Sequence, residues 1–103
     1  MPSAHSTWNF LTNHAHVLLT ISQEPDITVR RMAQLVGITE RAVMRIIGEL
    51  DEAGILVRER HGRRNRYTVN GDVPFRHPIE RHCTVACMID MYERAQQRQG
   101  SAS

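Results

Sequence analysis

Apolar residues recur at helical spacing in three successive segments of the first half of the chain. Each segment follows a residue type that caps helices and precedes a residue type that ends them. The third segment has the clearest pattern, because its apolar residues stand at i, i+3, i+4 and i+7 and share one face. We predict three helices, bounded by Asn13 and Pro25, by Thr28 and Gly37, and by Thr39 and Gly54.

Past the third helix the apolar period changes from 3.6 to two, which predicts two strands joined as a hairpin. Keeping the apolar residues on one side pairs Val57 with Val69 and leaves a tip of about three residues, 62–64. The same register places Arg60 opposite Arg66. Like charges that face each other weaken a sheet unless an anion lies between them.

A last helix is predicted from about Ile79 to about Gln97, with Pro78 at its start. Its apolar stripe is wider than one small core needs, so we expect part of it to contact a second subunit. The alternative is that Trp8 and Phe10 cover this stripe within the chain. The candidate dimer contacts are Val85, Met88, Ile89 and Tyr92.

Composition fits one small domain, with 103 residues of which 41% are hydrophobic and 23% charged. No apolar run approaches the roughly 18 residues of a membrane span. The first residues lack the basic and apolar regions of a secretory signal. We therefore expect a cytoplasmic protein with no membrane partner.

Charge is unevenly distributed, although the formal net charge is only +2. Residues 27–69 hold nine arginines against five acidic residues, whereas the rest of the chain holds four against six. All thirteen basic residues are arginines, whose planar guanidinium suits two-point contacts with anions. The predicted helices two and three and the hairpin are thus the basic part of the chain.

The order of helix, short helix, turn, helix and hairpin is that of a winged helix-turn-helix. Between Val29 and Gly48 the chain resembles the helix-turn-helix pattern, with Gly37 at the turn and the small Ala33 where two helices cross. Residues 49–56 and 62–67 resemble the recognition-helix exit and wing of MarR and ArsR-like transcriptional regulators. The resemblance covers about residues 8–92 and extends to a group of short, single-domain members. It implies sequence-selective binding of duplex DNA, usually as a dimer.

The expected fold is mainly α with a small β-hairpin wing, a winged helix-turn-helix followed by a C-terminal dimerisation helix. We divide the chain into an N-terminal arm (1–12), the DNA-binding domain (13–70), a crossing loop with the C-terminal helix (71–98), and a disordered tail (99–103).

The charges agree with DNA binding independently of the resemblance. Arg41 and Arg45 lie off the apolar stripe of the third helix, where each could bind a guanine edge or a phosphate, and Glu40 could accept from a cytosine amine. Arginines of the wing could enter a minor groove or bind its phosphates. The candidate DNA-binding residues are Arg30, Arg31, Thr39, Glu40, Arg41, Met44, Arg45, Arg58, Arg60, Arg63, Arg64 and Arg66.

His82, Cys83 and Cys87 are candidate ligands for zinc or copper, since two of them stand four residues apart on the last helix. The chain lacks the Cys-x-Cys and His-x-x-His spacings that ArsR-like metal sensors often carry. We therefore expect buried cysteines that act as small hydrophobic residues, no bound metal and no cofactor. A metal-responsive or thiol-responsive regulator remains an alternative.

Catalytic motifs are missing from the sequence, which has no Gly-rich phosphate loop, no His-Glu-x-x-His and no Gly-x-Ser-x-Gly. We expect no enzyme. The principal alternative is a winged helix that binds another protein and no DNA, because a fold alone does not determine function. That alternative predicts an apolar or acidic outer face on the third helix, which Arg41 and Arg45 contradict.

Overall fold

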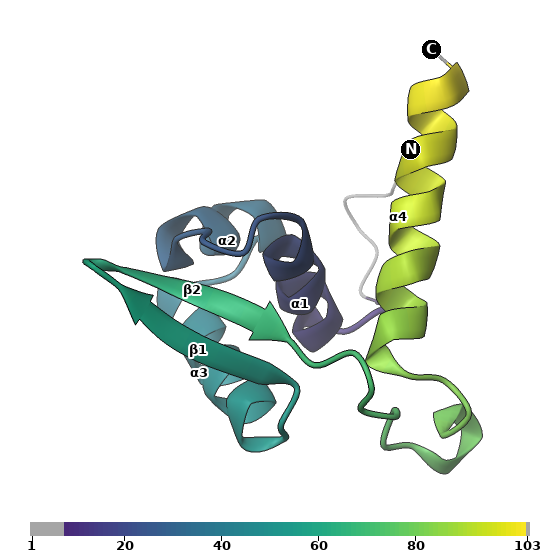
Figure 1. Ribbon diagram of the computed structural model, residues 1–103, viewed down its shortest axis with the longest axis horizontal. Coiled ribbons are helices and arrows are strands. Elements are labelled where there is room, and N and C mark those ends of the chain that lie inside the picture. The colour runs from purple at the N-terminus through teal and green to yellow at the C-terminus, as the bar shows by residue number, and fades with distance from the viewer. Residues whose placement is uncertain (1–7, 103) are drawn as a thin grey trace.

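Residues 8–102 are described by a computed structural model, with four α-helices and one antiparallel hairpin (Figure 1). The expected winged-helix fold and the order of its elements are confirmed. The part of the predicted N-terminal arm that spans residues 1–7 lies outside the described residues. The elements are α1 (Asn13–Gln23), α2 (Val29–Val36), α3 (Glu40–Glu52), β1 (Leu56–His61), β2 (Arg64–Val69), the 3-10 helix η1 (Pro78–Glu80) and α4 (Val85–Ala102).

Three threonines begin the first three helices. The side-chain oxygens of Thr12, Thr28 and Thr39 each accept a hydrogen bond from the backbone N–H three residues later, at 3.4, 3.1 and 3.0 Å. The predicted caps of α2 and α3 are therefore confirmed, whereas α1 is capped by Thr12 and not by Asn13. Gly37 ends α2 at a φ of 83°, a left-handed conformation that favours glycine.

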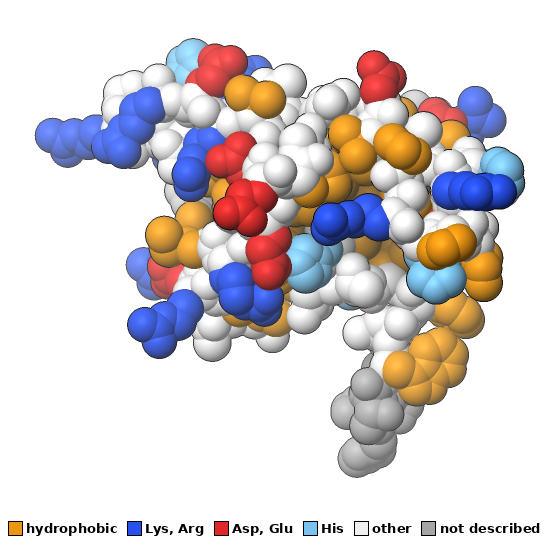
Figure 2. All heavy atoms as spheres, turned by 90° about the horizontal axis from the view of Figure 1, so that it is seen from below, with side chains coloured by type: hydrophobic (Ala, Val, Ile, Leu, Met, Phe, Trp, Pro, Cys, Tyr) orange, Lys and Arg blue, Asp and Glu red, His pale blue; other side chains and the backbone are white. Residues whose placement is uncertain are grey.

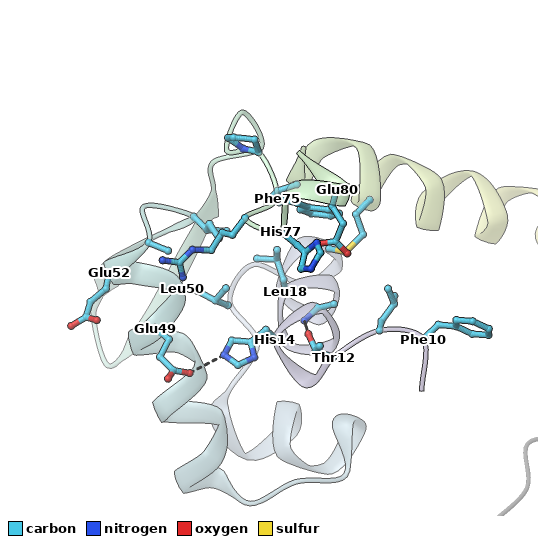
Figure 3. A pocket seen from close by; sticks show the side chains of 18 residues that line it. Phe10, Thr12, His14, Leu18, Glu49, Leu50, Glu52, Phe75, His77 and Glu80 are labelled. Atoms are coloured by element: carbon cyan, nitrogen blue, oxygen red, sulfur yellow. Dashed lines mark hydrogen bonds and ion pairs between the residues drawn. The ribbon is translucent and has the colours of Figure 1, made fainter. Parts of the chain in front are cut away.

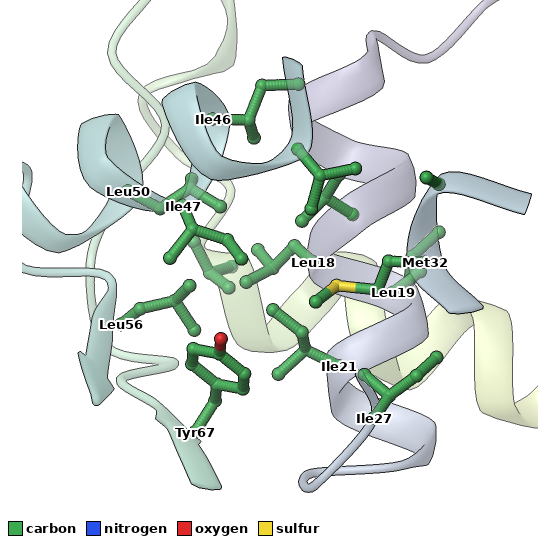
Figure 4. Close-up of a cluster of buried hydrophobic side chains, with 14 of the residues drawn as sticks. Leu18, Leu19, Ile21, Ile27, Met32, Ile46, Ile47, Leu50, Leu56 and Tyr67 are labelled. Atoms are coloured by element: carbon green, nitrogen blue, oxygen red, sulfur yellow. The ribbon is translucent and has the colours of Figure 1, made fainter. Parts of the chain in front are cut away.

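The hydrophobic core lies where the apolar faces of α1, α2 and α3 meet (Figure 4). The hairpin contributes Leu56 and Tyr67 to it, and α4 contributes Val85 and Met88. Within the described residues no buried side chain is polar or charged, apart from the phenol of Tyr67. The fully buried side chains with the largest volumes are Ile21, Met32, Ile46, Ile47, Leu56, Val17 and Val43.

The register of the hairpin differs from the predicted one. Leu56, not Val57, faces the core and pairs with Val69, and the tip consists of only Gly62 and Arg63. The prediction treated Val57 as the inward residue, but 52% of its surface is exposed whereas Leu56 is 1% exposed. The chain leaves α3 through a left-handed glycine and aims Leu56 into the core, so every later residue of β1 faces the opposite side from the one expected.

The observed register also removes the predicted repulsion between two arginines. Arg66 stands opposite Glu59, and Arg60 stands opposite Asn65. Gly62 has a φ of 61°, and Arg63 does not share a positive φ, as in a tight type II′ turn with glycine first. The wing therefore needs no anion to relieve its own strand pairing.

The hairpin is held in place at its base. The backbone N–H of Tyr67 donates to the carbonyl of Pro25, between α1 and α2, at 2.9 Å. Tyr67 is 4% exposed, and β1 packs against α3. The orientation of the wing relative to α3 is thus determined by the same core that holds the helices.

The segment between the hairpin and α4 differs most from prediction. Residues 79–84 do not begin an α-helix, because the backbone near residue 84 pairs with the strand-like residues before η1. Phe75 N–H donates to the carbonyl of Cys83, and Val85 N–H donates to the carbonyl of Val73. The helix starts at Val85, where the Thr84 hydroxyl accepts from a backbone N–H at 3.3 Å.

The far end of α4 runs beyond the other elements (Figure 1). Residues 99–102, which we expected in a disordered tail, instead continue this helix, and Ser103 lies outside the described residues. Within residues 8–102, no helix combines the length and apolar character that crossing a bilayer requires.

Candidate nucleic-acid interface

The outer face of α3 is formed by the residues that its core contacts leave free. Burial of Val43, Ile46, Ile47 and Leu50 turns the opposite side of the helix to solvent. That side carries four predicted DNA contacts near the beginning of the helix, Glu40, Arg41, Met44 and Arg45, and the Met44 side chain is 61% exposed. Every one of the predicted DNA-binding residues on α2, α3 and the hairpin is exposed.

Arg41 and Arg45 are one helical turn apart on this face, but their surroundings differ. Within residues 8–102, Arg41 and Glu40 form no ion pair. The Arg45 guanidinium pairs with Glu49, Nη1 to Oε1, at 3.2 Å. Arg41 can thus meet an anion directly, whereas Arg45 must first leave its carboxylate partner.

The wing presents arginines on both faces of its two-stranded ribbon. Arg58 and Arg60 share the face of Leu56, and Arg64 and Arg66 lie on the other. The Arg60 side chain donates from Nε to the Gly62 carbonyl at 3.1 Å. The other three of these arginines form no side-chain hydrogen bond with the described part of the chain. The ribbon therefore projects cations in two directions.

Basic side chains spread along the edge of the molecule that carries the wing, with acidic side chains beside them (Figure 2). Arg30 and Arg31 extend the basic set to the first turn of α2, where both are exposed. Positive charge is unfavourable at a helix N-terminus, so these side chains gain from an external anion.

One cluster was not predicted from the sequence. Glu49 Oε1 accepts from Arg45 of the same helix at 3.2 Å. It also accepts from His14 Nε2 of α1 at 2.8 Å, the contact drawn in Figure 3. The hydrogen bond from His14 lowers the pKa of Glu49, and the charge of Arg45 lowers it further. The spacing of Arg45 and Glu49 was visible as an i, i+4 pair, but His14 lies 35 residues away along the chain.

An open groove of about 810 Å³ lies beside this cluster, between α1, the end of α3, the crossing segment and the start of α4 (Figure 3). Its apolar wall includes Leu18, Leu50 and Phe75, and His14 and Glu49 stand at its edge. The groove therefore touches the carboxylate that holds Arg45.

The four predicted dimer contacts differ in how far they are buried within this chain. Val85 and Met88 are 2% and 8% exposed and belong to the core of this chain, so they offer almost no surface to a partner. Ile89 and Tyr92 are only partly buried against that core. Met91, which we did not include, is 59% exposed on the same helix.

The cysteines are not core residues, contrary to the expectation. Cys83 and Cys87 are both exposed free thiols, because the α-helix begins only at Val85 and directs Val85 and Met88 inward instead. Hydrogen bonds from the backbone and side chain of Thr84 lower the pKa of the Cys87 thiol. His82 is also exposed, and no group of three or more potential ligands that could hold a metal occurs in the described part of the chain.

Comparison with protein families gives one match. A family model described as the MarR family matches residues 8–66. A search of the curated proteins finds no match for the chain.

Three similar solved structures come from different bacteria. Lactococcus lactis ZitR in complex with DNA has a TM-score of 0.52 and 15% identity, over 68% of this chain and 49% of its own. Mycobacterium tuberculosis RV1404 has a TM-score of 0.55 and 18% identity, over 91% of this chain and 60% of its own. MepR, a transcription regulator of the Staphylococcus aureus multidrug efflux pump MepA, has a TM-score of 0.54 and 15% identity, over 89% of this chain and 64% of its own. The chain thus spans from about half to just under two-thirds of these structures, and such low identity shows a shared fold.

Proposed function

Since this chain belongs to the MarR family, we propose that it is a transcriptional regulator, not an enzyme, and binds double-stranded DNA in the cytoplasm. The observation that carries the proposal is the run of exposed arginines over α2, the start of α3 and both faces of the wing. ZitR, which has a similar fold, is known in complex with DNA. An exposed cationic surface of this extent suits the phosphates of a duplex.

In this proposal the first half of α3 enters the major groove. Arg41 and Arg45 reach guanine edges or phosphates, and Glu40 accepts from a cytosine amine. Met44 offers an apolar contact to a thymine methyl group, and Thr39 contacts the backbone beside the helix start. The acidic residues at the other end of the helix would repel phosphates, so only the first turns approach the bases.

The wing and α2 hold the phosphate backbone on either side of that groove. Arg63 at the tip and the four strand arginines follow the minor groove or its flanking phosphates. Arg30 and Arg31 bind a phosphate at the start of α2. These contacts position the protein without reading sequence.

We also propose that the protein acts as a homodimer through α4. The helix extends beyond the core and carries the exposed Met91 next to the half-buried Ile89 and Tyr92. The exposed aromatic side chains of Trp8 and Phe10, whose rings are 5.1 Å apart, add apolar surface that a second chain can cover. Sedimentation analysis tests this proposal, and a monomer at all accessible concentrations would refute it.

The experiment that tests DNA binding is a titration of a duplex at two salt concentrations. For about six to ten phosphate contacts per dimer, affinity should fall by about 10³ to 10⁵ between about 50 and 200 mM salt. A winged helix that binds only proteins would show no such dependence, and this outcome would replace our proposal with that alternative.

Three variants separate base reading from phosphate binding on duplexes selected from random sequence. Arg45→Ala should cost about 1–3 kcal/mol on the preferred duplex and relax the preference at one base pair. Replacing Arg63 and Arg64 with Ala should weaken all duplexes alike. Arg81→Ala is the matched control, because Arg81 is exposed and directly follows η1, and the segment between β2 and α4 lies away from the tip of the wing (Figure 1). If Arg45→Ala weakens every sequence equally, its base-reading role is wrong.

A further inference from the structure

The carboxylate of Glu49 accepts hydrogen bonds from two helices through a single oxygen. Oε1 accepts from Arg45 Nη1 of α3 at 3.2 Å and from His14 Nε2 of α1 at 2.8 Å. We propose that Glu49 competes with DNA for Arg45 and that His14 controls this competition, so that protonation of His14 tightens DNA binding. The inference rests on the proposed DNA-binding function and adds a determinant of its affinity.

The geometry makes Glu49 a competitor. Arg41, Arg45 and Glu49 follow one another at four-residue spacing, so they form a single stripe with about 6 Å of rise per step. The acidic group thus stands directly behind the arginine that faces the duplex. An arginine binds a guanine edge or a phosphate best with two parallel N–H groups, and a guanidinium tied to a carboxylate must give up that contact first.

The contact is weak enough to be exchanged. The side chains of Arg45 and Glu49 are 61% and 48% exposed, so water screens their attraction. DNA can therefore displace Glu49, at a cost in affinity. Such a pair adjusts binding without preventing it.

His14 is placed to change that cost. Its side chain is 45% exposed, and it reaches the same carboxylate oxygen that Arg45 uses. A neutral imidazole only donates a hydrogen bond, whereas a protonated one adds a positive charge beside the guanidinium. Two cations on one oxygen repel each other, and the protonated ring also offsets the negative charge that Glu49 turns toward phosphates. Both effects release Arg45 to DNA.

Glu49 itself stays ionised over the range in which histidines change charge. The hydrogen bond from His14 and the charge of Arg45 lower the pKa of Glu49, whereas histidine side chains usually titrate between about pH 5 and 8. The controlling event is therefore at the imidazole. The other titratable and charged side chains around the same groove are Glu52 of α3 and Arg76, His77 and Glu80 of the crossing segment and η1.

The first test compares two charge-neutralising variants of α3. Glu49→Gln should tighten duplex binding by about two- to fivefold, the range expected for an exposed ion pair. Glu52→Gln is the matched control, since it removes the same charge from the last turn of the same helix without a contact to Arg45. It should change affinity by clearly less. In an Arg45→Ala background, the two substitutions should have the same small effect.

The second test is a pH series of DNA affinity by fluorescence anisotropy at constant salt. Wild-type affinity should rise from about pH 8 to 6 by more than that of His14→Gln, which keeps a hydrogen-bond donor but cannot become charged. The difference between His14 and Gln should shrink in a Glu49→Gln background, where only the screened attraction of the charged ring to phosphates remains. Other histidines affect both proteins alike and cancel in this comparison.

The outcomes distinguish this inference from the proposed function. Salt-dependent DNA binding with no excess gain for Glu49→Gln over Glu52→Gln, or with the full pH dependence kept in His14→Gln, overturns the inference alone. Absence of salt-dependent duplex binding by the wild type overturns both. Thermal unfolding of each variant checks that the fold is retained, which the exposure of these side chains leads us to expect.

Discussion

The packing of the crossing segment against α4 can be tested at a single glycine. A Cβ at Gly71 would lie 2.8 Å from the Cβ of Ala86 and 3.3 Å from its Cα. The Ala86 N–H donates to the Gly71 carbonyl at 3.0 Å, so the two segments cannot separate without losing that bond. Gly71 has no positive φ, and the cost of Gly71→Ala is therefore steric.

The magnitude follows from this overlap. Adding a methyl group to a filled contact costs about 1–3 kcal/mol of unfolding free energy. For a domain of about 100 residues, each kcal/mol shifts Tm by about 4–8 °C. We therefore expect Gly71→Ala to lower Tm by at least about 4 °C, measured by far-UV circular dichroism without DNA and at one protein concentration.

The same chemical change elsewhere in the chain serves as the control. Gly48 lies inside α3, and a Cβ there would meet nothing within 4 Å. Gly48→Ala should stabilise the protein by about 0.5–1 kcal/mol, because alanine favours a helix interior over glycine. Adding Ala86→Gly to Gly71→Ala should recover part of the loss. A Gly71→Ala protein that melts at or above the wild-type Tm would refute the close contact between the crossing segment and α4.

Two further predictions concern α3. Thr39→Ala should lower stability by about 1 kcal/mol, because it removes the side-chain acceptor at the start of the helix, whereas Thr39→Ser keeps the acceptor and most of the Tm. Carbon-detected NMR should find the pKa of Glu49 below the usual 4.5 and find it raised in His14→Ala, since the largest cause of its shift is then removed. Folding lowers the pKa of Glu49, so the contact contributes its full stability at pH values above the usual pKa of this carboxyl group. That contribution is lost as the pH falls through the lower pKa of the folded state. An unchanged Glu49 pKa in His14→Ala would contradict the contact.

The sequence by itself determined the helices of the basic half and their order. The caps at Thr28 and Thr39 and the left-handed Gly37 act within one helical turn, so they can be recognised from neighbouring residues. The exposure of Arg41 and Arg45 also followed, because burial of the apolar stripe leaves the opposite face of a helix in solvent. These inferences needed only local spacing.

Only the tertiary structure decided the hairpin register, the start of α4 and the partner of Glu49. Both Leu56 and Val57 suit a strand, and the path of the chain out of α3 selects which of them enters the core. The backbone hydrogen bond from Phe75 to Cys83 keeps the residues before Val85 out of α4. The packing of α1 on α3 brings His14 to Glu49. Each of these results depends on contacts between segments distant in the sequence, whose relative positions are set by the packing of the whole core and not by residue periodicity.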